Sequence, residues 1–522
     1  MKNIKYLLKA VVILGIVFAF VAPGAAMLSQ YQVEKKLEAK LPSTMKTTFG
    51  MNPGWVEQAS NFWEPSRGIH YMHAVDENIV WAVGYDGSGS SIPVQEFTRT
   101  TDGGTIWHAD TIDDAPIDGD TAMIFALDAD HAWVPIHSGD PQGIWNTSDG
   151  GSTWDHQDTA LFSGTGAFPN CVHFWDENDG WCMGDQVDGY YEIYTTTDGG
   201  NNWVRVPSEN IPAPQSSIEY GVVGYYDVVG DTVWFGTQDA TYGGRVYKST
   251  DKGLHWTVSD VIFSPGSYID IRFRDELNGL AMDKNFTDAS LAETSDGGDT
   301  WTSITYTGKC HGADFDYVPG TTNMYVSTGV QTGVPENNGA TFSLDGGHSW
   351  TAWSEVEGIQ LFGTTWVDGI IGWGGNFNVD ETTGGVYKYT PGTTNNPPDK
   401  PIIEGPAMGT AGKEYDYTFK AYDFDEDDIK EFVVYWGDGT PDETISGPFA
   451  PGEEVIASHT WERQKDYKIT ATAEDVNGGV SEEASFFVTM PKNKAVHRSI
   501  FLWFFENHQN IFPILRQILG LF

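Results

Sequence analysis

The chain has 522 residues, of which 40% are hydrophobic and 14% aromatic, so it is long enough for one large or several ordinary domains. Its formal net charge of −44 argues against a nucleic-acid partner, because the phosphates would be repelled. The 60 Gly and 20 Trp residues favour a fold of many short strands joined by tight turns.

Residues 1–28 have the layout of a signal peptide. Three Lys residues precede an apolar run, and small residues around Ala26 provide a cleavage site. The apolar run, residues 10–28, is also nearly long enough to cross a bilayer, so an uncleaved N-terminal membrane anchor is the alternative. Both interpretations predict an extracellular or cell-surface protein, either secreted or tethered to the membrane. Residues 29–50 are predicted to be a linker.

A short motif, Ser/Thr-x-Asp-x-Gly-x-x-Trp, occurs six times at steps of 45 to 53 residues. At a tight turn an Asp side chain can accept backbone N–H groups, Gly supplies the positive φ angle, and a Trp ring can pack against the strand edge. A catalytic site would be needed once rather than six times, so the motif predicts a structural turn. Its Asp residues are Asp102, Asp149, Asp198, Asp251, Asp296 and Asp345, and its Trp residues are Trp107, Trp154, Trp203, Trp256, Trp301 and Trp350.

Each motif lies between the third and fourth strands of a unit with four predicted strands. An alternating strand, a turn and a second strand lie upstream, as in HAVDENIVWAVG at 73–84; a third strand enters the motif and a fourth leaves its Trp. Repeats of this length with four strands predict a β-propeller. Because seven strand-pair phrases accompany six motifs, we expect an all-β, seven-bladed propeller of four-stranded blades over residues 51–392. A strand near residues 54–60 would complete its last blade.

The motif is similar to the Asp-box, or BNR repeat, of the sialidase-like propeller superfamily. Together with the upstream phrase, F-x-D…GW-x-x-G, it most resembles the propellers of the photosystem II assembly and stability factor family. The resemblance covers residues 54–392. It implies a non-catalytic scaffold or binding protein, and it does not imply a photosystem partner.

One level of the propeller is a candidate ligand site. The first strand of each blade lines the central tunnel, and aligning six of the strand phrases on their Asp places one side chain of each phrase at the same level. Imidazole, aromatic and guanidinium groups arranged in a circle at one level can bind a ligand. His73, His173, Tyr226 and Arg272 are therefore the ligand-binding candidates. The alternative is that these side chains only pack between blades. The aligned residues are His73, Phe125, His173, Tyr226, Arg272 and Thr365.

A glycoside hydrolase of the sialidase type is an alternative function. Sialidases have an Arg triad, a Tyr nucleophile and a Phe-Arg-Ile-Pro phrase; that phrase is absent, and nothing selects three of the propeller's Arg residues. Catalytic residues of such an enzyme are therefore unknown. Xyloglucanases with Asp-boxes use two propellers, whereas this chain has one. A purely structural component of the cell envelope is a third interpretation.

Three Cys residues allow two interpretations. Cys171 and Cys182 flank a predicted hairpin, and a disulfide is permitted outside the cytoplasm. Two buried thiols are the alternative. The Cys spacing fits no zinc site.

A second domain is predicted beyond a Pro- and Asn-rich linker at 393–401. Alternating strands over 402–490 indicate an immunoglobulin-like β-sandwich. YWGDGT at 435–440, SHTW at 458–461 and AEDVNGG at 473–479 are similar to phrases of the PKD domain. This resemblance implies an extracellular spacer, or a module that binds protein or sugar.

The same domain has a candidate cation site. Asp423, Asp425 and Asp427, with Asp475 later in the chain, predict several carboxylates near one end of the sandwich. Hard oxygen ligands at short spacing suit Ca²⁺, and a solvated acidic loop is the alternative.

Residues 491–522 form an apolar tail that is interrupted by charge, Asn and Pro. This pattern predicts short amphipathic helices lying on a membrane or on a partner. The sequence as a whole predicts a secreted or cell-surface, non-catalytic scaffold. We expect its propeller to recognise an extracellular protein or glycan, with membrane contact through the N-terminal segment and the tail.

Overall fold

The computed structural model describes residues 54–164, 166–260, 262–284, 289–367, 370–391 and 395–491. The predicted signal peptide or anchor, the linker at 29–50 and residues 492–522 of the tail lie outside this set. A search of the described residues finds no helix with the length and hydropathy needed to cross a membrane. The chain divides into two compact units between Asn395 and Asn396.

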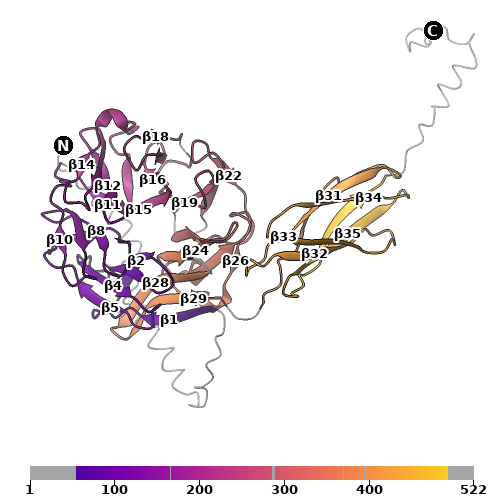
Figure 1. Ribbon diagram of the computed structural model, residues 1–522, viewed down its shortest axis with the longest axis horizontal. Coiled ribbons are helices and arrows are strands. Elements are labelled where there is room, and N and C mark those ends of the chain that lie inside the picture. The colour runs from indigo at the N-terminus through magenta and orange to yellow at the C-terminus, as the bar shows by residue number, and fades with distance from the viewer. Residues whose placement is uncertain are drawn as a thin grey trace, which may run out of the picture. The chain divides into compact units, whose positions relative to one another are not determined.

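The first unit consists of antiparallel sheets arranged round a centre (Figure 1). Four sheets have four strands that pair in chain order. Their strands are β11 (Pro169–Phe174), β12 (Asp179–Val187), β13 (Tyr190–Thr197) and β14 (Val204–Arg205); β15 (Tyr220–Val229), β16 (Thr232–Gln238), β17 (Val246–Ser249) and β18 (Thr257–Val258); β19 (Ile269–Phe273), β20 (Gly279–Asp283), β21 (Ser290–Thr294) and β22 (Thr302–Ile304); and β23 (Asp314–Tyr317), β24 (Tyr325–Gly329), β25 (Gly339–Ser343) and β26 (Thr351–Ala352).

Two further sheets complete the first unit. One has five strands, because the short strands β6 and β7 both pair with β8; it contains β6 (Asp120–Thr121), β7 (Phe125–Ala126), β8 (Ala132–His137), β9 (Gly143–Thr147) and β10 (Asp155–His156). The other has eight strands: β1 (Gly54–Ala59), β2 (Arg67–Ala74), β3 (Val80–Asp86), β4 (Glu96–Thr100), β5 (His108–Thr111), β27 (Thr364–Val367), β28 (Ile371–Asp380) and β29 (Thr383–Thr390). Short 3-10 helices lie at η1 (Ser208–Asn210), η2 (Pro335–Asn337) and η3 (Ser354–Val356).

The eight-stranded sheet separates naturally into two blades. A single residue pair, Gly68 with Phe377, joins β2 to β28. If the eight-stranded sheet is divided at this pair, the described strands of the first unit form seven groups. This number is consistent with the expected seven blades.

The first and last strands of the unit close the ring of blades. β1 pairs with β29 in an unbroken register from Gly54 with Thr390 to Ala59 with Gly385. The expectation that a strand near residues 54–60 completes the last blade is therefore confirmed. Trp55, in β1, is 8% exposed.

The second strands of most blades are buried on both faces between neighbouring blades. β16 is buried along its whole length, and β8 is buried from Ala132 to Ile136. Such strands read as continuous apolar runs rather than as alternating patterns. Apart from β1, the fourth strands are short and largely exposed, as in β5 and β22.

All six Asp-box motifs make the same turn between the third and fourth strands. Thr294 Oγ1 accepts a hydrogen bond from Gly298 N at 2.9 Å and donates to Asp296 Oδ1 at 2.8 Å. Asp296 Oδ1 also accepts from Thr300 N at 2.9 Å. The other five motifs repeat these three hydrogen bonds. The motif Trp rings are buried except that of Trp301, which is half-buried. These contacts are those expected of a self-contained turn.

The thiols of Cys171 and Cys182 are both free and buried. Val172, rather than Cys171, lies opposite Cys182 in the β11–β12 pair. Because neighbouring residues of a strand point to opposite faces, the two Cys side chains leave the sheet on opposite sides. Of the two interpretations, the structure therefore has the buried thiols.

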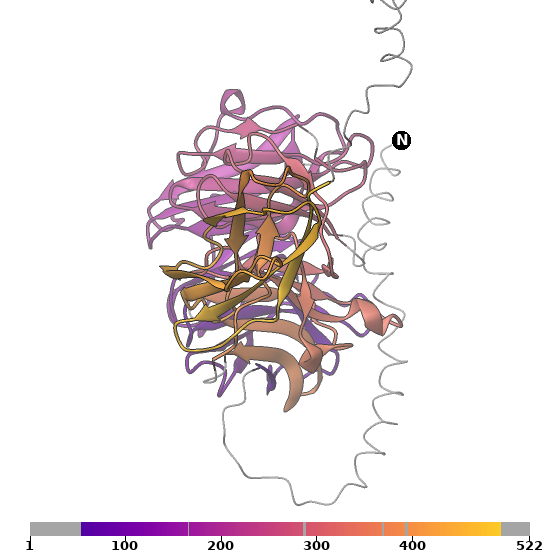
Figure 2. The same cartoon turned by 90° about the vertical axis from the view of Figure 1, so that its right-hand side faces the viewer.

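The second unit is a β-sandwich of two sheets, seen from two sides in Figures 1 and 2. The sheets share a core that includes Tyr417, Trp436 and Trp461. One sheet contains β30 (Ile402–Glu404), β31 (Glu414–Lys420) and β34 (Val455–Thr460). The other contains β32 (Ile429–Tyr435), β33 (Glu443–Phe449), β35 (Asp466–Asp475) and β36 (Ala484–Thr489).

Candidate functional site

One residue in the first strand of each blade occupies an equivalent position. In five blades it pairs across the hairpin with the residue eight positions later, as His73 pairs with Trp81. The other two hairpins are one residue shorter and two residues longer, and the equivalent residues there are Asp227 and Asp316. These seven residues, termed the ring, are His73, Phe125, His173, Asp227, Arg272, Asp316 and Thr365.

Tyr226 lies one residue away from its expected level. The hairpin between β15 and β16 is the shorter one, since Asp227 pairs with Trp234, seven positions later. The phrase at 226–236 also lacks the Asp on which the others align, so the sequence alignment was one residue out of register there. Asp227 takes the ring position, and Tyr226 lines the same cavity.

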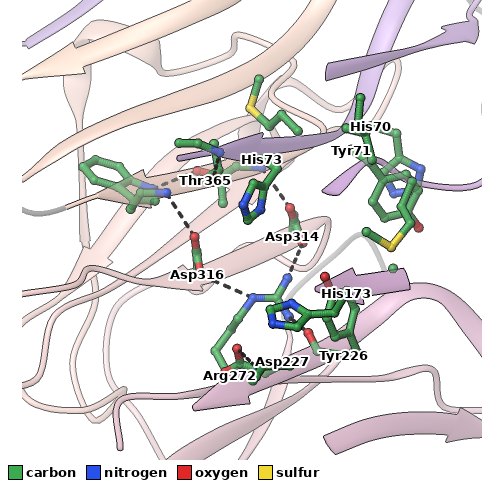
Figure 3. Close-up of a pocket in the computed structure, with 18 residues that line it drawn as sticks. His70, Tyr71, His73, His173, Tyr226, Asp227, Arg272, Asp314, Asp316 and Thr365 are labelled. Carbon is green, nitrogen blue, oxygen red and sulfur yellow. Dashed lines mark hydrogen bonds and ion pairs between the residues drawn. The ribbon is translucent and has the colours of Figure 1, made fainter. Parts of the chain in front are cut away.

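The ring lies around a cavity of about 240 Å³ (Figure 3). All four ligand-binding candidates line it, and so does Thr365, whereas Phe125 does not. The imidazole rings of His73 and His173 and the guanidinium of Arg272 face the same space in Figure 3. Other lining residues were not predicted from the sequence; they include His70, Tyr71, Asp227, Asp314, Asp316 and Trp366.

Aromatic groups form one side of the ring. The ring centroids of His73 and Phe125 are 4.7 Å apart, those of Phe125 and His173 4.4 Å, and those of His173 and Tyr226 5.9 Å. Burial lowers the pKa of His73 to about 4. It also lowers the pKa of His173 to about 3, and the nearby His73 adds to this effect. Both imidazoles are therefore neutral at pH 7.

Carboxylates surround Arg272 on the other side of the ring. Its guanidinium lies 2.6 Å from Asp270 Oδ1, 3.4 Å from Asp316 Oδ1 and 3.9 Å from Asp314 Oδ1. Burial alone would lower the pKa of Arg272, but these carboxylates outweigh it and raise that pKa. The guanidinium is thus held in place by protein groups.

A buried Lys extends this charged cluster. Lys284 Nζ, whose side chain is 1% exposed, lies 2.8 Å from Asp314 Oδ1 and 3.1 Å from Asp270 Oδ2. With Asp227 and Asp316, the cluster has four carboxyl groups and two cations, Arg272 and Lys284.

Burial raises the pKa of three of these carboxyl groups, those of Asp227, Asp314 and Asp316. Burial raises the pKa of Asp316 to about 8, although the charge of Arg272 opposes the shift. Burial raises the pKa of Asp227 to about 6, again against Arg272. Asp316 is therefore largely protonated at neutral pH, which reduces the charge imbalance of the cluster.

Side chains of the ring also bridge neighbouring blades. Thr365 Oγ1 accepts a hydrogen bond from Ala74 N at 3.2 Å, and Asp227 Oδ2 accepts one from Phe273 N. Ala74 and Phe273 lie in the first strands of their blades, β2 and β19. On the side facing the tunnel, neither strand has a strand partner at these residues, so the two hydrogen bonds satisfy their backbone N–H groups. Part of the ring thus has the packing role that the sequence analysis left open as an alternative.

Three of the four candidate cation ligands lie close together in the acidic loop of the second unit. Oxygen atoms of Asp423, Asp425 and Asp427 all lie within 4.8 Å of one another. Asp475 is buried outside this group, and its Oδ1 accepts hydrogen bonds from Asn477 N and Gly479 N at 2.7 and 2.9 Å.

No family model and no curated protein matches the chain. Among solved structures, the PKD domain of an M14-like peptidase from a Thermoplasmatales archaeon is 42% identical over 19% of this chain and 100% of that chain, with a TM-score of 0.18. The NanB sialidase of Streptococcus pneumoniae is 10% identical over 68% of this chain and 72% of that chain, with a TM-score of 0.36. The CARDB domain of a Pyrococcus furiosus protein, solved with di-metal ions, is 24% identical over 19% of this chain and 96% of that chain, with a TM-score of 0.14. The resemblance to the photosystem II factor family stays a prediction. By its strand topology, the chain is all-β, with a β-propeller followed by an immunoglobulin-like β-sandwich.

Proposed function

We propose that the protein is a secreted or cell-surface binding protein whose propeller takes one neutral sugar residue of a glycan into the ring cavity. The observation that carries this proposal is the make-up of the cavity wall. Aromatic rings form one side, and fixed polar groups form the other. Protein ligands, which the sequence analysis also allowed, are an outcome of the test below.

The size of the cavity suits a small group. Drug-sized ligands occupy clefts of roughly 300–1,000 Å³. A cavity of about 240 Å³ is below that range, and a single sugar ring is of suitable size. Flat groups such as Tyr226 and the neutral imidazole of His73 offer apolar faces to a sugar ring, and their polar atoms can bond its hydroxyl groups.

The charge of the cluster argues against an anionic ligand. Four carboxyl groups and two cations leave the site with a net negative charge, even when Asp316 is protonated. Arg272 is already held by Asp270 and Asp316, so binding a ligand carboxylate would require those contacts to break. A neutral sugar avoids this cost, because hydroxyl groups can donate to the carboxylates and accept from the guanidinium.

A glycoside hydrolase is a second candidate, favoured by one observation. A carboxyl group with a pKa of about 8, as at Asp316, is protonated at neutral pH and can act as a general acid. Against this candidate, Arg272 is the one Arg of the described cavity wall, whereas sialidases use three.

Binding of the full chain to an array of neutral and acidic glycans tests the proposal. We expect retention on neutral glycans, weaker retention on sialylated or uronic-acid glycans, and no cleavage on prolonged incubation. A preference for acidic glycans, or no glycan binding at all, would contradict it. Released sugar would support the hydrolase instead, and binding to envelope proteins alone would identify a protein ligand.

A further inference from the structure

A loop between β31 and β32 gathers three carboxylates from alternate positions. One oxygen each from Asp423, Asp425 and Asp427 lies within 4.8 Å of the other two. Oxygens that are each 2.3–2.6 Å from one Ca²⁺ ion can be at most about 5 Å apart. The three carboxylates therefore have a spacing that one ion can bridge.

The carboxylate of Asp423 has an unmet bonding requirement, which is a separate observation from the spacing. Asp423 is 0% exposed, and its Oδ1 accepts hydrogen bonds from Asp425 N at 2.8 Å and Asp427 N at 3.3 Å. Its Oδ2 is buried and has no hydrogen-bond partner in the protein. A buried carboxylate oxygen without a partner is costly, and a bound cation would satisfy it. Burial, with the charges of Asp425 and Asp427, raises the pKa of Asp423 to about 7.

Neighbouring Asn residues orient the other two carboxylates. Asn396 donates from its backbone N to Asp425 Oδ2 at 2.6 Å and from Nδ2 to Asp425 Oδ1 at 2.9 Å. Asn477 Nδ2 donates to Asp427 Oδ2 at 2.7 Å. Each carboxylate oxygen has a second lone pair, so these contacts leave ligand capacity at the loop.

We propose that Asp423, Asp425 and Asp427 bind one Ca²⁺ ion, with Asn396 and Asn477 as positioning residues. The donors are all oxygen atoms, which suit Ca²⁺ or Mg²⁺ rather than zinc. Ca²⁺ tolerates irregular geometry and completes six to eight ligands with carbonyls and water, whereas Mg²⁺ demands a near-ideal octahedron. Asp475 acts through the loop that carries Asn477 rather than as a ligand. This proposal is independent of the sugar-binding proposal.

Calorimetric titration of the chelator-treated full chain with Ca²⁺ tests the site. Excess Mg²⁺ in the buffer suppresses general cation binding to this acidic protein. We expect one saturable Ca²⁺ site per chain that is lost, or weakened at least tenfold, in Asp425→Asn and in Asp427→Asn. The matched control is Asp442→Asn, which removes the same charge from an exposed position of the same unit and should leave the site unchanged.

Two checks separate loss of the site from loss of the fold. Circular dichroism of each variant should match the wild type, because Asn keeps the shape of Asp. Terbium luminescence, sensitised by aromatic residues such as Tyr422, should be displaced by Ca²⁺ in the wild type and the control only. The proposal is wrong if the wild type shows no saturable site under these conditions, or if folded Asp425→Asn and Asp427→Asn both bind as tightly as the wild type.

Discussion

Asp316 Oδ2, in β23, accepts a hydrogen bond from the backbone N–H of Trp366, in β27, at 3.1 Å. The bond joins the first strands of two neighbouring blades that do not pair with each other as strands. The same carboxyl group faces the ring cavity and lies 3.4 Å from Arg272 Nε. One side chain therefore contributes both to blade contact and to the chemistry of the cavity.

Replacing Asp316 tests its contribution to blade contact. Asp316→Ala leaves the Trp366 N–H without an acceptor, which should lower the free energy of unfolding by about 1–3 kcal/mol. Asp316→Asn keeps an acceptor oxygen of the same shape and should cost less. Urea unfolding followed by tryptophan fluorescence measures both values. Equal losses in the two variants would mean that the hydrogen bond contributes little.

The raised pKa of Asp316 predicts a pH effect on stability. Between the ordinary carboxyl pKa of about 4 and the folded value of about 8, the folded state holds a proton that the unfolded state has released. Stability due to this group therefore falls as pH rises through that window. Between pH 6.5 and 8, where His73 and His173 are already neutral, the wild type should lose on the order of 1–2 kcal/mol relative to Asp316→Asn.

The control for this pH effect is Asp113→Asn, which removes the same charge from an exposed position of the first unit. It should keep the wild-type dependence on pH. If the wild type and both variants respond identically between pH 6.5 and 8, the proton is not held at Asp316.

Trp55 tests the closure of the first unit by β1. Its ring lies 5.6 Å from that of Trp353, 5.8 Å from that of Trp366 and 5.5 Å from that of Tyr389. Trp55→Ala should lower the free energy of unfolding by about 3–5 kcal/mol, because it leaves a cavity in this cluster. Trp63→Ala, at a side chain that is 43% exposed, should cost clearly less in the same thermal or urea melt.

The Asp-box turn is tested most cleanly at Thr294. Thr294→Val keeps the shape of the side chain but removes the hydroxyl that bonds Gly298 N and Asp296 Oδ1. We expect a loss of about 1–3 kcal/mol in the free energy of unfolding. Thr302→Val, at an exposed position of β22, is the matched control and should be nearly neutral. A neutral Thr294→Val would show that the turn does not depend on this hydroxyl.

Local patterns were sufficient to predict the blades, the turns and the closing strand. Each repeat carries its own strand alternation and its own turn, and the position of Trp55 matched that of a Trp after an Asp-box. The ring could be predicted only where hairpins have equal length. Asp227 and Asp316 were missed because their hairpins differ by one residue or two, which shifts the register without changing the apolar pattern.

Contacts between distant segments left no signal in the sequence. The spacing of Asp423, Asp425 and Asp427 was visible, but Asn396 lies 29 residues from its partner Asp425 and belongs to another segment of the unit. Asp314 meets Lys284 from a neighbouring blade, so neither residue was recognisable as part of one cluster. The first pairing depends on the packing of segments within the second unit, and the second on the way neighbouring blades meet.

Glycan-array binding by Tyr226→Phe, compared with Tyr242→Phe, tests the central claim most directly. The first change removes a hydroxyl from the cavity wall, and the second removes one from a residue that is 57% exposed and absent from that wall. We predict that binding of neutral glycans falls by roughly two- to tenfold in Tyr226→Phe, the effect of one hydrogen bond. Tyr242→Phe should bind as the wild type does. Full glycan binding by Tyr226→Phe, or an equal loss in both variants, would contradict the assignment of the ligand to the ring cavity.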